Sequence, residues 1–498
     1  MKIILFISAL LLLAIRATAQ FISGQAANVV LGQPNFSTGG IKPFDSTNFG
    51  GPRGIAIDPA SGKLFVATGH RILRFSSQAA MISGSSAEAV FGQPNFLVDV
   101  SGFTASKMSV PYGVAVDRFG NLYVADSENH RVLRFMNAAT APSGSAAVIA
   151  FGQPNLTSRI SNNGGLSASS MSFPTGVVVD SLGNLYVCDS ENNRVLRFAN
   201  AATAVTGAAA SVALGQPNLT SGTANNGGLS ASTLSQPYSV AVDGSGNLYV
   251  VDSGNSRVLR FANAASVSTG AAASIALGQP DFFSGSFNNN LTSPTANTMS
   301  YPFGVAVNSS GNLYVGDSEN NRVLLFVNAA TAVTGAAASI ALGQPNLTSG
   351  TANNGGLSAS TMNIPYGVAL DPSGNLYVAD QNNNRVLRFN NSISNIRENQ
   401  KGSPQTYALH HNYPNPFNPS TTIGYQLPVT GDVSLKVYDV LGREVATLVN
   451  ASQAAGSYQA NFNASNVSSG VYFYRLEVSS ASSQGNLFVQ TKKMVLVK

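Results

Sequence analysis

The stretch that decides the fold is 174–198, with the sequence PTGVVVDSLGNLYVCDSENNRVLRF. It holds three short apolar runs, VVV, LYV and VLRF, which are rich in β-branched and aromatic residues. Turn sequences separate the runs, because Asp180 can accept hydrogen bonds from nearby backbone and Gly183 can adopt a positive φ. The pattern predicts three antiparallel strands joined by tight turns.

This unit occurs six times along the chain. The copies begin at Pro52, Pro111, Pro174, Pro237, Pro302 and Pro365. Each of the first five ends in a Phe that is followed 17 residues later by the Gly of a GQP motif, as with Phe198 and Gly215. An apolar run such as SVALGQ precedes each GQP and predicts a fourth strand. Four strands repeated at about 60 residues are typical of the blades of a β-propeller.

The last unit ends at Phe389 and has no GQP run after it, whereas an unpaired copy, ANVVLGQPNF, lies at 27–36, before the first unit. We therefore expect the N-terminal segment to complete the sixth blade and to remove the open edge between the first and last blades. The fold class predicted is all-β: a six-bladed β-propeller with four-stranded blades over residues 20–390, plus a small C-terminal β-sandwich.

The ends of the chain differ from the repeats. Residues 1–19 have Lys2, an apolar run and an Ala-Thr-Ala sequence, which together predict a cleavable signal peptide. No other apolar stretch approaches about 18 residues, so we expect no transmembrane segment in the mature chain. Residues 391–405 are polar and predict a linker. Residues 406–498 contain alternating runs such as VSLKVYDV and predict the β-sandwich.

The net charge of +5 does not indicate a nucleic-acid partner. Residues 41–390 contain 17 Lys and Arg against 17 Asp and Glu, so the surplus of positive charge lies at the two ends of the chain. A neutral main body lacks the basic surface that binds phosphate backbones.

The repeated pattern, with PxGVAVDxxGNLYVADxxNxRVLRF as its consensus, resembles NHL repeats over about residues 27–390. It departs from them in its longer connections after strand three and after GQP. NHL propellers bind proteins, RNA or other ligands, and some relatives are lyases. The resemblance therefore implies the fold and leaves the function open.

The C-terminal residues resemble a second family. The sequence NYPNPFNP at 412–419, GREV at 442–445 and SGVY at 469–472 are similar to the type A sorting domain of the type IX secretion system. This resemblance runs through nearly all of 406–498. It implies the type IX machinery as a partner, removal of the domain during export, and an extracellular or cell-surface location in a Gram-negative, Bacteroidetes-like bacterium.

The residue that follows each repeat proline should lie where strand one enters beside the central channel. We select these six as candidate ligand-binding residues: Arg53, Tyr112, Thr175, Tyr238, Phe303 and Tyr366. Four are aromatic, and a ring of aromatic side chains can stack on sugar faces or hold apolar groups. The alternative is that they only pack against neighbouring blades.

The strand-two to strand-three turns offer oxygen ligands, beginning at Asp126, Asp189, Asp252, Asp317 and Asp380. A Ca²⁺ or other divalent site is one interpretation. Their recurrence in five units favours an architectural role, in which the Asp caps the turn and holds an arginine such as Arg194. We expect no cofactor.

Signs of catalysis are few. His70 and His130 occupy the same repeat position and do not obviously converge. The residues that break the repeat form no recognisable ligand set; they are Arg53, Lys63, Glu88, Lys107, Arg118 and Arg159. We expect a monomeric, secreted or surface-displayed, non-catalytic binding or adhesion module for a protein or polysaccharide. The alternatives are a metal-dependent propeller hydrolase or lyase with its site in the channel, and a structural surface-coat protein.

Overall fold

The computed structural model describes residues 21–77, 80–391, 406–412, 414–453, 456–479 and 486–497. The predicted signal peptide, 1–19, lies outside the described residues, as do residues 392–405 of the predicted linker. The described chain forms two compact units, one up to Asn391 and one C-terminal to it. Within the described ranges, no helix has the length and apolar character needed to cross a membrane.

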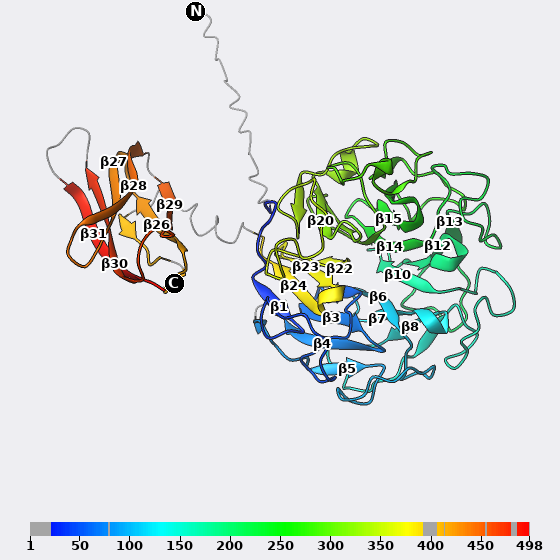
Figure 1. The fold of residues 1–498 in the computed structure, drawn as a ribbon. Coiled ribbons are helices and arrows are strands. Elements are labelled where there is room, and N and C mark those ends of the chain that lie inside the picture. Colours follow the sequence, from blue (N-terminus) through cyan, green and yellow to red (C-terminus); the bar gives the residue numbers. More distant parts are fainter. Residues whose placement is uncertain are drawn as a thin grey trace, which may run out of the picture. The chain divides into compact units, whose positions relative to one another are not determined.

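The first unit is a ring of six four-stranded antiparallel sheets (Figure 1). The first sheet has β2 (Ile55–Ile57), β3 (Lys63–Thr68), β4 (Arg71–Ser77) and β5 (Ala89–Phe91). The second has β6 (Pro111–Val116), β7 (Leu122–Asp126), β8 (Arg131–Phe135) and β9 (Ile149–Phe151). The third has β10 (Pro174–Val179), β11 (Leu185–Asp189), β12 (Arg194–Phe198) and β13 (Val212–Leu214). The predicted strand order within the repeat is confirmed.

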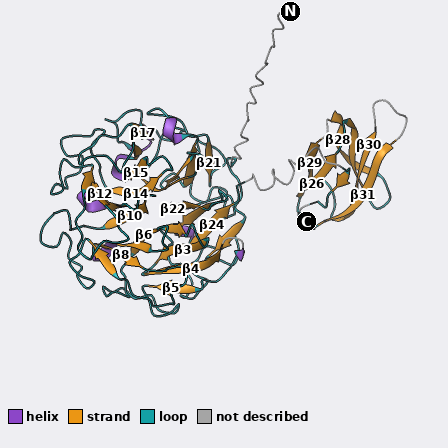
Figure 2. Cartoon of the chain, turned by 180° about the vertical axis from the view of Figure 1, so that it is seen from behind, coloured by secondary structure: helices purple, strands orange, loops and turns teal. Residues whose placement is uncertain are grey.

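The remaining three blades follow the same order. The fourth has β14 (Pro237–Val242), β15 (Leu248–Asp252), β16 (Arg257–Phe261) and β17 (Ile275–Leu277). The fifth has β18 (Pro302–Val307), β19 (Leu313–Asp317), β20 (Arg322–Phe326) and β21 (Ile340–Leu342). The sixth has β22 (Pro365–Leu370), β23 (Leu376–Asp380), β24 (Arg385–Phe389) and β1 (Val29–Leu31). Single-turn helices lie in several connections (Figure 2): η2 (Ser127–Asn129), η3 (Ser190–Asn192), η4 (Ser253–Asn255), η5 (Phe287–Asn290), η6 (Ala329–Thr331) and η7 (Gln381–Asn383).

The N-terminal strand closes the ring, as the sequence predicts. β1 pairs antiparallel with β24, with Val29 opposite Arg388 and Val30 opposite Leu387. Val30 and Leu387 are both fully buried. The first strand therefore contributes apolar contacts as well as hydrogen bonds to the last blade.

The first strands of neighbouring blades lie side by side around the centre and make a closed circle, β2–β6–β10–β14–β18–β22 (Figure 1). Their backbones approach closely at the glycine of each Pro-x-Gly sequence. A Cβ on Gly113 would lie 2.2 Å from the carbonyl oxygen of Thr175, and one on Gly54 would lie 2.1 Å from that of Tyr112. A side chain at either glycine would collide with the neighbouring strand, although the fourth unit carries Ser239 at the same repeat position.

A buried arginine ties each long connection to its blade. In the third blade Arg194 Nε donates to Asp189 Oδ2 at 2.7 Å, and its other nitrogens donate to the carbonyls of Ser167, Ser170 and Leu219. Neither side chain of the ion pair is exposed. The same pair recurs in the other four blades that carry the turn aspartate. The arginine of the third strand thus fixes the conformation of the connecting loops through its hydrogen bonds to their carbonyls.

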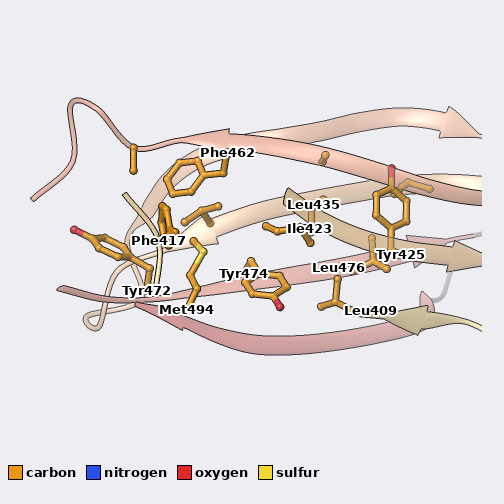
Figure 3. Close-up of a cluster of buried hydrophobic side chains, with 14 of the residues drawn as sticks. Leu409, Phe417, Ile423, Tyr425, Leu435, Phe462, Tyr472, Tyr474, Leu476 and Met494 are labelled. Atoms are coloured by element: carbon orange, nitrogen blue, oxygen red, sulfur yellow. The ribbon is translucent and has the colours of Figure 1, made fainter. Parts of the chain in front are cut away.

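The second unit has two sheets, as expected for a sandwich. One has β25 (Ala408–Leu409), β26 (Ser420–Leu427) and β29 (Gly456–Asn463), and the other has β28 (Glu444–Gln453), β27 (Gly431–Tyr438), β30 (Gly470–Ser479) and β31 (Asn486–Leu496). Alternate residues of β26, β27 and β30 are buried, and Figure 3 shows Ile423, Leu435 and Tyr474 among the buried side chains between the strands. The Tyr474 hydroxyl donates to the His410 carbonyl at 2.8 Å and accepts from the Asn412 backbone N–H at 3.0 Å.

Candidate ligand-binding face at the channel mouth

The entry of each first strand is held by a hydrogen bond from the preceding blade. In the second blade, His130 Nδ1 accepts from the backbone N–H of Phe173, the residue before Pro174, at 3.0 Å. Phe173 has φ of +52°, which a bulky residue rarely adopts. Side chains at the same repeat position make the equivalent bond at the other five junctions; they are His70, Asn193, Ser256, Asn321 and Asn384. This contact fixes where the residue after each proline enters the mouth.

The two propeller histidines are therefore hydrogen-bond acceptors in the frame of the ring. Burial lowers the pKa of His130, with Glu191 and Glu128 opposing the shift, and a neutral ring is what an acceptor Nδ1 requires. Asn and Ser replace His at four junctions. This repeat position thus needs a hydrogen-bond acceptor, which Asn and Ser supply as well as His does.

The structure brings the six candidate residues together around one small hollow. Three tyrosines meet there, with ring centroids of Tyr112 and Tyr238 5.8 Å apart and those of Tyr112 and Tyr366 5.9 Å apart. Phe303 lies 4.5 Å from both Tyr238 and Tyr366. The Tyr238 and Tyr366 hydroxyls are 2.7 Å apart, and burial raises the pKa of both, so both stay neutral. The aromatic side chains pack on one another and fill the mouth.

Arg53 is the charged member of the six. Its guanidinium carbon lies 4.9 Å from the centroid of the Tyr112 ring, a cation–π distance. Its Nε and Nη1 are buried and have no hydrogen-bond partner among the described residues. The residues that line the hollow include no carboxylate. Two buried guanidinium nitrogens without acceptors are costly unless a ligand or water satisfies them.

Thr175 contributes to the wall of the hollow and little to its chemistry. It is 1% exposed, and its hydroxyl donates to the Pro237 carbonyl at 3.2 Å. The space left in the mouth is about 40 Å³. That volume suits one water-sized group, since a water occupies roughly 30 Å³. A small polar tip of a ligand fits the mouth, and a whole sugar ring does not.

The turn aspartates are engaged in architecture. Asp189 Oδ1 accepts from the Ser172 backbone N–H at 2.7 Å, and Oδ2 accepts from Asn192 and Arg194. The expectation that Asp caps the turn is wrong, because both oxygens are used by these three donors and no side-chain bond reaches the helical turn's own N–H groups. The expected contact with Arg194 is present. Among the described residues, no three His, Cys, Asp or Glu side chains gather as a metal-ligand group.

Most of the other residues that break the repeat lie apart from the mouth. Lys63 and Glu88 form a surface ion pair at 2.5 Å, which Arg74 joins at 2.7 Å from Glu88. Arg159 stacks on Phe103, with its guanidinium carbon 4.3 Å from the ring centroid. These contacts are local and do not form a site with Arg53.

A larger hollow, of about 580 Å³, lies in the loop between β17 and β18, and sequence reasoning missed it. Its lining includes Gln279, Phe283, Asn289 and Asn290. The available signal was the break in the repeat: the sequence DFFSGSFNNN at 281–290 stands where other units have NLTSGTANNG. The loop from the Gly of GQP to the next repeat proline is also two residues longer here than in the third unit, counted from Gly278 and Gly215.

Comparison with known proteins gives low identities to solved structures. Virginiamycin B lyase from Staphylococcus aureus is 12% identical, with 68% of this chain and 84% of that chain covered and a TM-score of 0.36. A gluconolactonase from Xanthomonas campestris is 13% identical, with 73% and 98% covered and a TM-score of 0.41. An auxiliary nutrient binding protein from Bacteroides thetaiotaomicron is 12% identical, with 72% and 75% covered and a TM-score of 0.44. No curated protein matches the chain.

Two family profiles match the sequence. The secretion system C-terminal sorting domain matches residues 411–490, which lie within the second unit. This match places the protein outside the cell or on its surface, in a Bacteroidetes-like bacterium, with the secretion machinery as a partner. The teneurin NHL domain matches residues 97–390, which hold the second to sixth repeat units, while the first sheet lies before the match. Because that match covers more than half of the sequence and the sheets form the expected ring, the chain belongs to the teneurin NHL domain family of β-propellers.

Proposed function

We propose that the propeller is a non-catalytic binding or adhesion module, displayed outside the cell, whose loop face binds a protein or polysaccharide that carries an anionic group. The observation that carries this proposal is Arg53, whose buried Nε and Nη1 have no partner in a mouth lined by aromatic side chains. Carboxylate and other anionic groups accept short, charge-assisted hydrogen bonds from such guanidinium nitrogens. The cleavable signal peptide at 1–19 belongs to the same proposal, since the module must leave the cytoplasm.

The role of the ring follows from its packing. The tyrosine and phenylalanine rings hold one another rigidly, so the guanidinium stacked on Tyr112 is held in place before ligand arrives. A preorganised donor binds with a smaller loss of conformational entropy than a mobile one. The surrounding loops then supply most of the contact area, since binding residues commonly lie on loops that a rigid scaffold positions.

A channel enzyme is the second candidate considered from the sequence, and the geometry supports it less well. Both His70 and His130 accept backbone N–H groups at blade junctions, and the turn aspartates are paired with arginines. A hydrolase or lyase needs convergent acid, base or metal-binding groups. The mouth itself presents tyrosine hydroxyls and one arginine.

The test is a binding measurement with the full chain. We expect it to bind immobilised polygalacturonate, a polyuronate, more tightly than dextran, which is neutral. Arg53→Gln should weaken binding by about ten-fold or more, because a charged hydrogen bond contributes roughly 1.5–3 kcal/mol. Arg118→Gln is the matched control, since Arg118 is an exposed arginine on the β6–β7 turn, at the other end of its sheet from the mouth.

Equal binding of the parent and Arg53→Gln proteins to polygalacturonate would refute the role of Arg53. A tightly held divalent metal whose removal abolishes hydrolysis of a lactone substrate would move the assignment to the propeller hydrolase.

A further inference from the structure

We propose that the loop between β17 and β18 forms a binding site for a neutral saccharide. This inference deepens the proposed binding function, on which it rests, by naming a second site and the class of its ligand. The site consists of the hollow of about 580 Å³ and the side chains that line it. Eight of the ten residues that line it belong to this connection, and the other two are Leu229, before β14, and Asn255, in η4.

The first observation is an acceptor without a donor. Gln279 is fully buried, and its Nε2 donates to three carbonyls, those of Asn255, Ser256 and Ser286, at 3.3, 3.2 and 2.8 Å. Three carbonyls around one end of the amide fix which end is nitrogen. Oε1 therefore points the other way, and it has no hydrogen-bond partner in the described structure. A buried amide oxygen without a partner requires a ligand or water to complete it.

Three other blades satisfy this acceptor from within the loop, whereas Gln33 Oε1 and Gln93 Oε1 have no partner among the described residues, like Gln279 Oε1. Gln153 Oε1 accepts from Asn163 Nδ2 at 3.2 Å, and Gln216 and Gln344 accept from asparagines in the same way. By repeat position the donor in the fourth loop should be Asn289. Asn289 instead has φ of +51°, whereas Asn163 does not have a positive φ. In the fourth loop Oε1 has no such donor among the described residues, and Gln279 is one of the residues that line the hollow.

The loop backbone differs from the repeat at this point. Asn288, Asn289 and Asn290 have positive φ values of 47°, 51° and 61° in succession. Asn162, Asn225 and Asn353 share the positive φ of Asn288, and Asn adopts this region more readily than other non-glycine residues, so the departure from the repeat is at Asn289 and Asn290. Asn289 is half-buried and Asn290 is exposed, and both line the hollow. Their amides can both donate to and accept from hydroxyl groups.

The second feature is an aromatic side chain that the fold does not bury. Phe283 is 75% exposed and lines the same hollow. Its backbone N–H donates to Asp281 Oδ1 at 2.8 Å, which fixes the start of the loop. The equivalent residue in the previous unit is Thr220, whose N–H binds Asn218 in the same way. The aromatic ring is therefore an addition to an unchanged local turn.

These features together select the ligand class. None of the residues that line the hollow is ionisable, so the ligand is uncharged. Amide groups match the paired donors and acceptors of sugar hydroxyls, and an exposed aromatic ring packs against the C–H face of a sugar ring. The volume falls within the range of about 300–1,000 Å³ that holds small ligands. A mono- or disaccharide unit of a neutral glycan fits all of these conditions.

The experiment is saturation-transfer NMR, followed by calorimetry, on the full chain with oligosaccharides of glucose, galactose, mannose and N-acetylglucosamine. We expect at least one to bind, and Phe283→Thr to weaken it by at least about ten-fold, as truncation of a central aromatic contact does. Thr is the residue that the previous unit carries here, so the variant folds. Asn289→Gly, which keeps the positive φ and removes the amide, should also weaken binding.

Leu97→Thr is the matched control, because Leu97 occupies the same repeat position in another loop and is 76% exposed. It should leave the affinity unchanged. Absence of binding by all four sugar series, or an affinity unaltered in Phe283→Thr, would overturn the assignment. Polygalacturonate binding measured on the same proteins reports the Arg53 site separately, so failure here is distinguishable from failure of the proposed function.

Discussion

Replacing Asp189 by Asn tests whether the buried ion pair braces the propeller. The substitution keeps the shape of the side chain and an oxygen for the Ser172 N–H, and it removes the charge that faces Arg194. Arg194 is 0% exposed, so its charge then has no counter-charge and no access to water. Leaving one charge of a buried pair alone typically costs about 3–5 kcal/mol. We expect a loss of that size in the free energy of unfolding.

The pair need not be favourable as a whole. Burial raises the pKa of Asp189, while the charge of Arg194 and three hydrogen-bond donors oppose the shift. Arg194→Met removes the charge and three bonds to loop carbonyls, and we expect it to cost about 3–5 kcal/mol as well. The double variant no longer contains the Arg194 charge that Asp189→Asn alone leaves buried without a counter-charge. Its cost should therefore be close to that of Arg194→Met alone, which gives a coupling energy of about 3 kcal/mol.

The assay is urea unfolding followed by circular dichroism, with hydrogen exchange of residues 162–172 as a local measure, because Arg194 binds the carbonyls of Ser167 and Ser170. Arg118→Met, an exposed arginine, serves as control and should change stability by less than about 0.5 kcal/mol. A cost below about 1 kcal/mol for Asp189→Asn, or a double variant whose cost equals the sum of the two single costs, would refute the reasoning.

Two further predictions concern the junctions between blades. Burial lowers the pKa of His130 below the ordinary value of about 6.5, so as the pH falls below about 6.5 the unfolded chain takes up the proton first and the folded state loses stability. His130→Asn, which supplies the acceptor that Asn193 supplies at another junction, should reduce that loss in thermal melts between pH 7 and 5. An unchanged pH profile would contradict this prediction. Gly113→Ala places a Cβ 2.2 Å from the Thr175 carbonyl oxygen and should lower the free energy of unfolding in urea by about 1–3 kcal/mol. Gly244→Ala is the control and should leave stability unchanged, because a Cβ there meets nothing within 4 Å. Equal stabilities of the two variants would show that the inner strands can move apart.

The repeat pattern was sufficient to predict the blades and their closure. Strand pairing within a unit depends on local alternation and turn residues, which the sequence PTGVVVDSLGNLYVCDSENNRVLRF states directly. The pairing of β1 with β24 followed from counting GQP runs against repeat units. The pairing of Asp189 with Arg194 followed from its recurrence, although the details of the turn did not.

The site was less accessible to sequence reasoning. The six residues after the repeat prolines were expected at the mouth, and they line it. Their packing on one another depends on how closely Gly54 and Gly113 let the inner strands approach, which is a distance in three dimensions. The open hollow at Gln279 depends on the backbone of Asn289, and an Asn–Asn pair in sequence also occurs at 162–163, where the amide closes the gap. Composition alone could not separate the two cases.

The pairing of β1 with β24 also gives assembly of the ring an order in time. During synthesis β1 emerges first and has no partner until β24 emerges, after five other blades. Until then β1 has an unpaired edge, of the kind that recruits strands from other chains. A chain cut short anywhere before Arg385 can never cover that end of the circle. The ring is thus complete only once the chain has reached Phe389, and a product truncated before that point stays open to proteases and to aggregation.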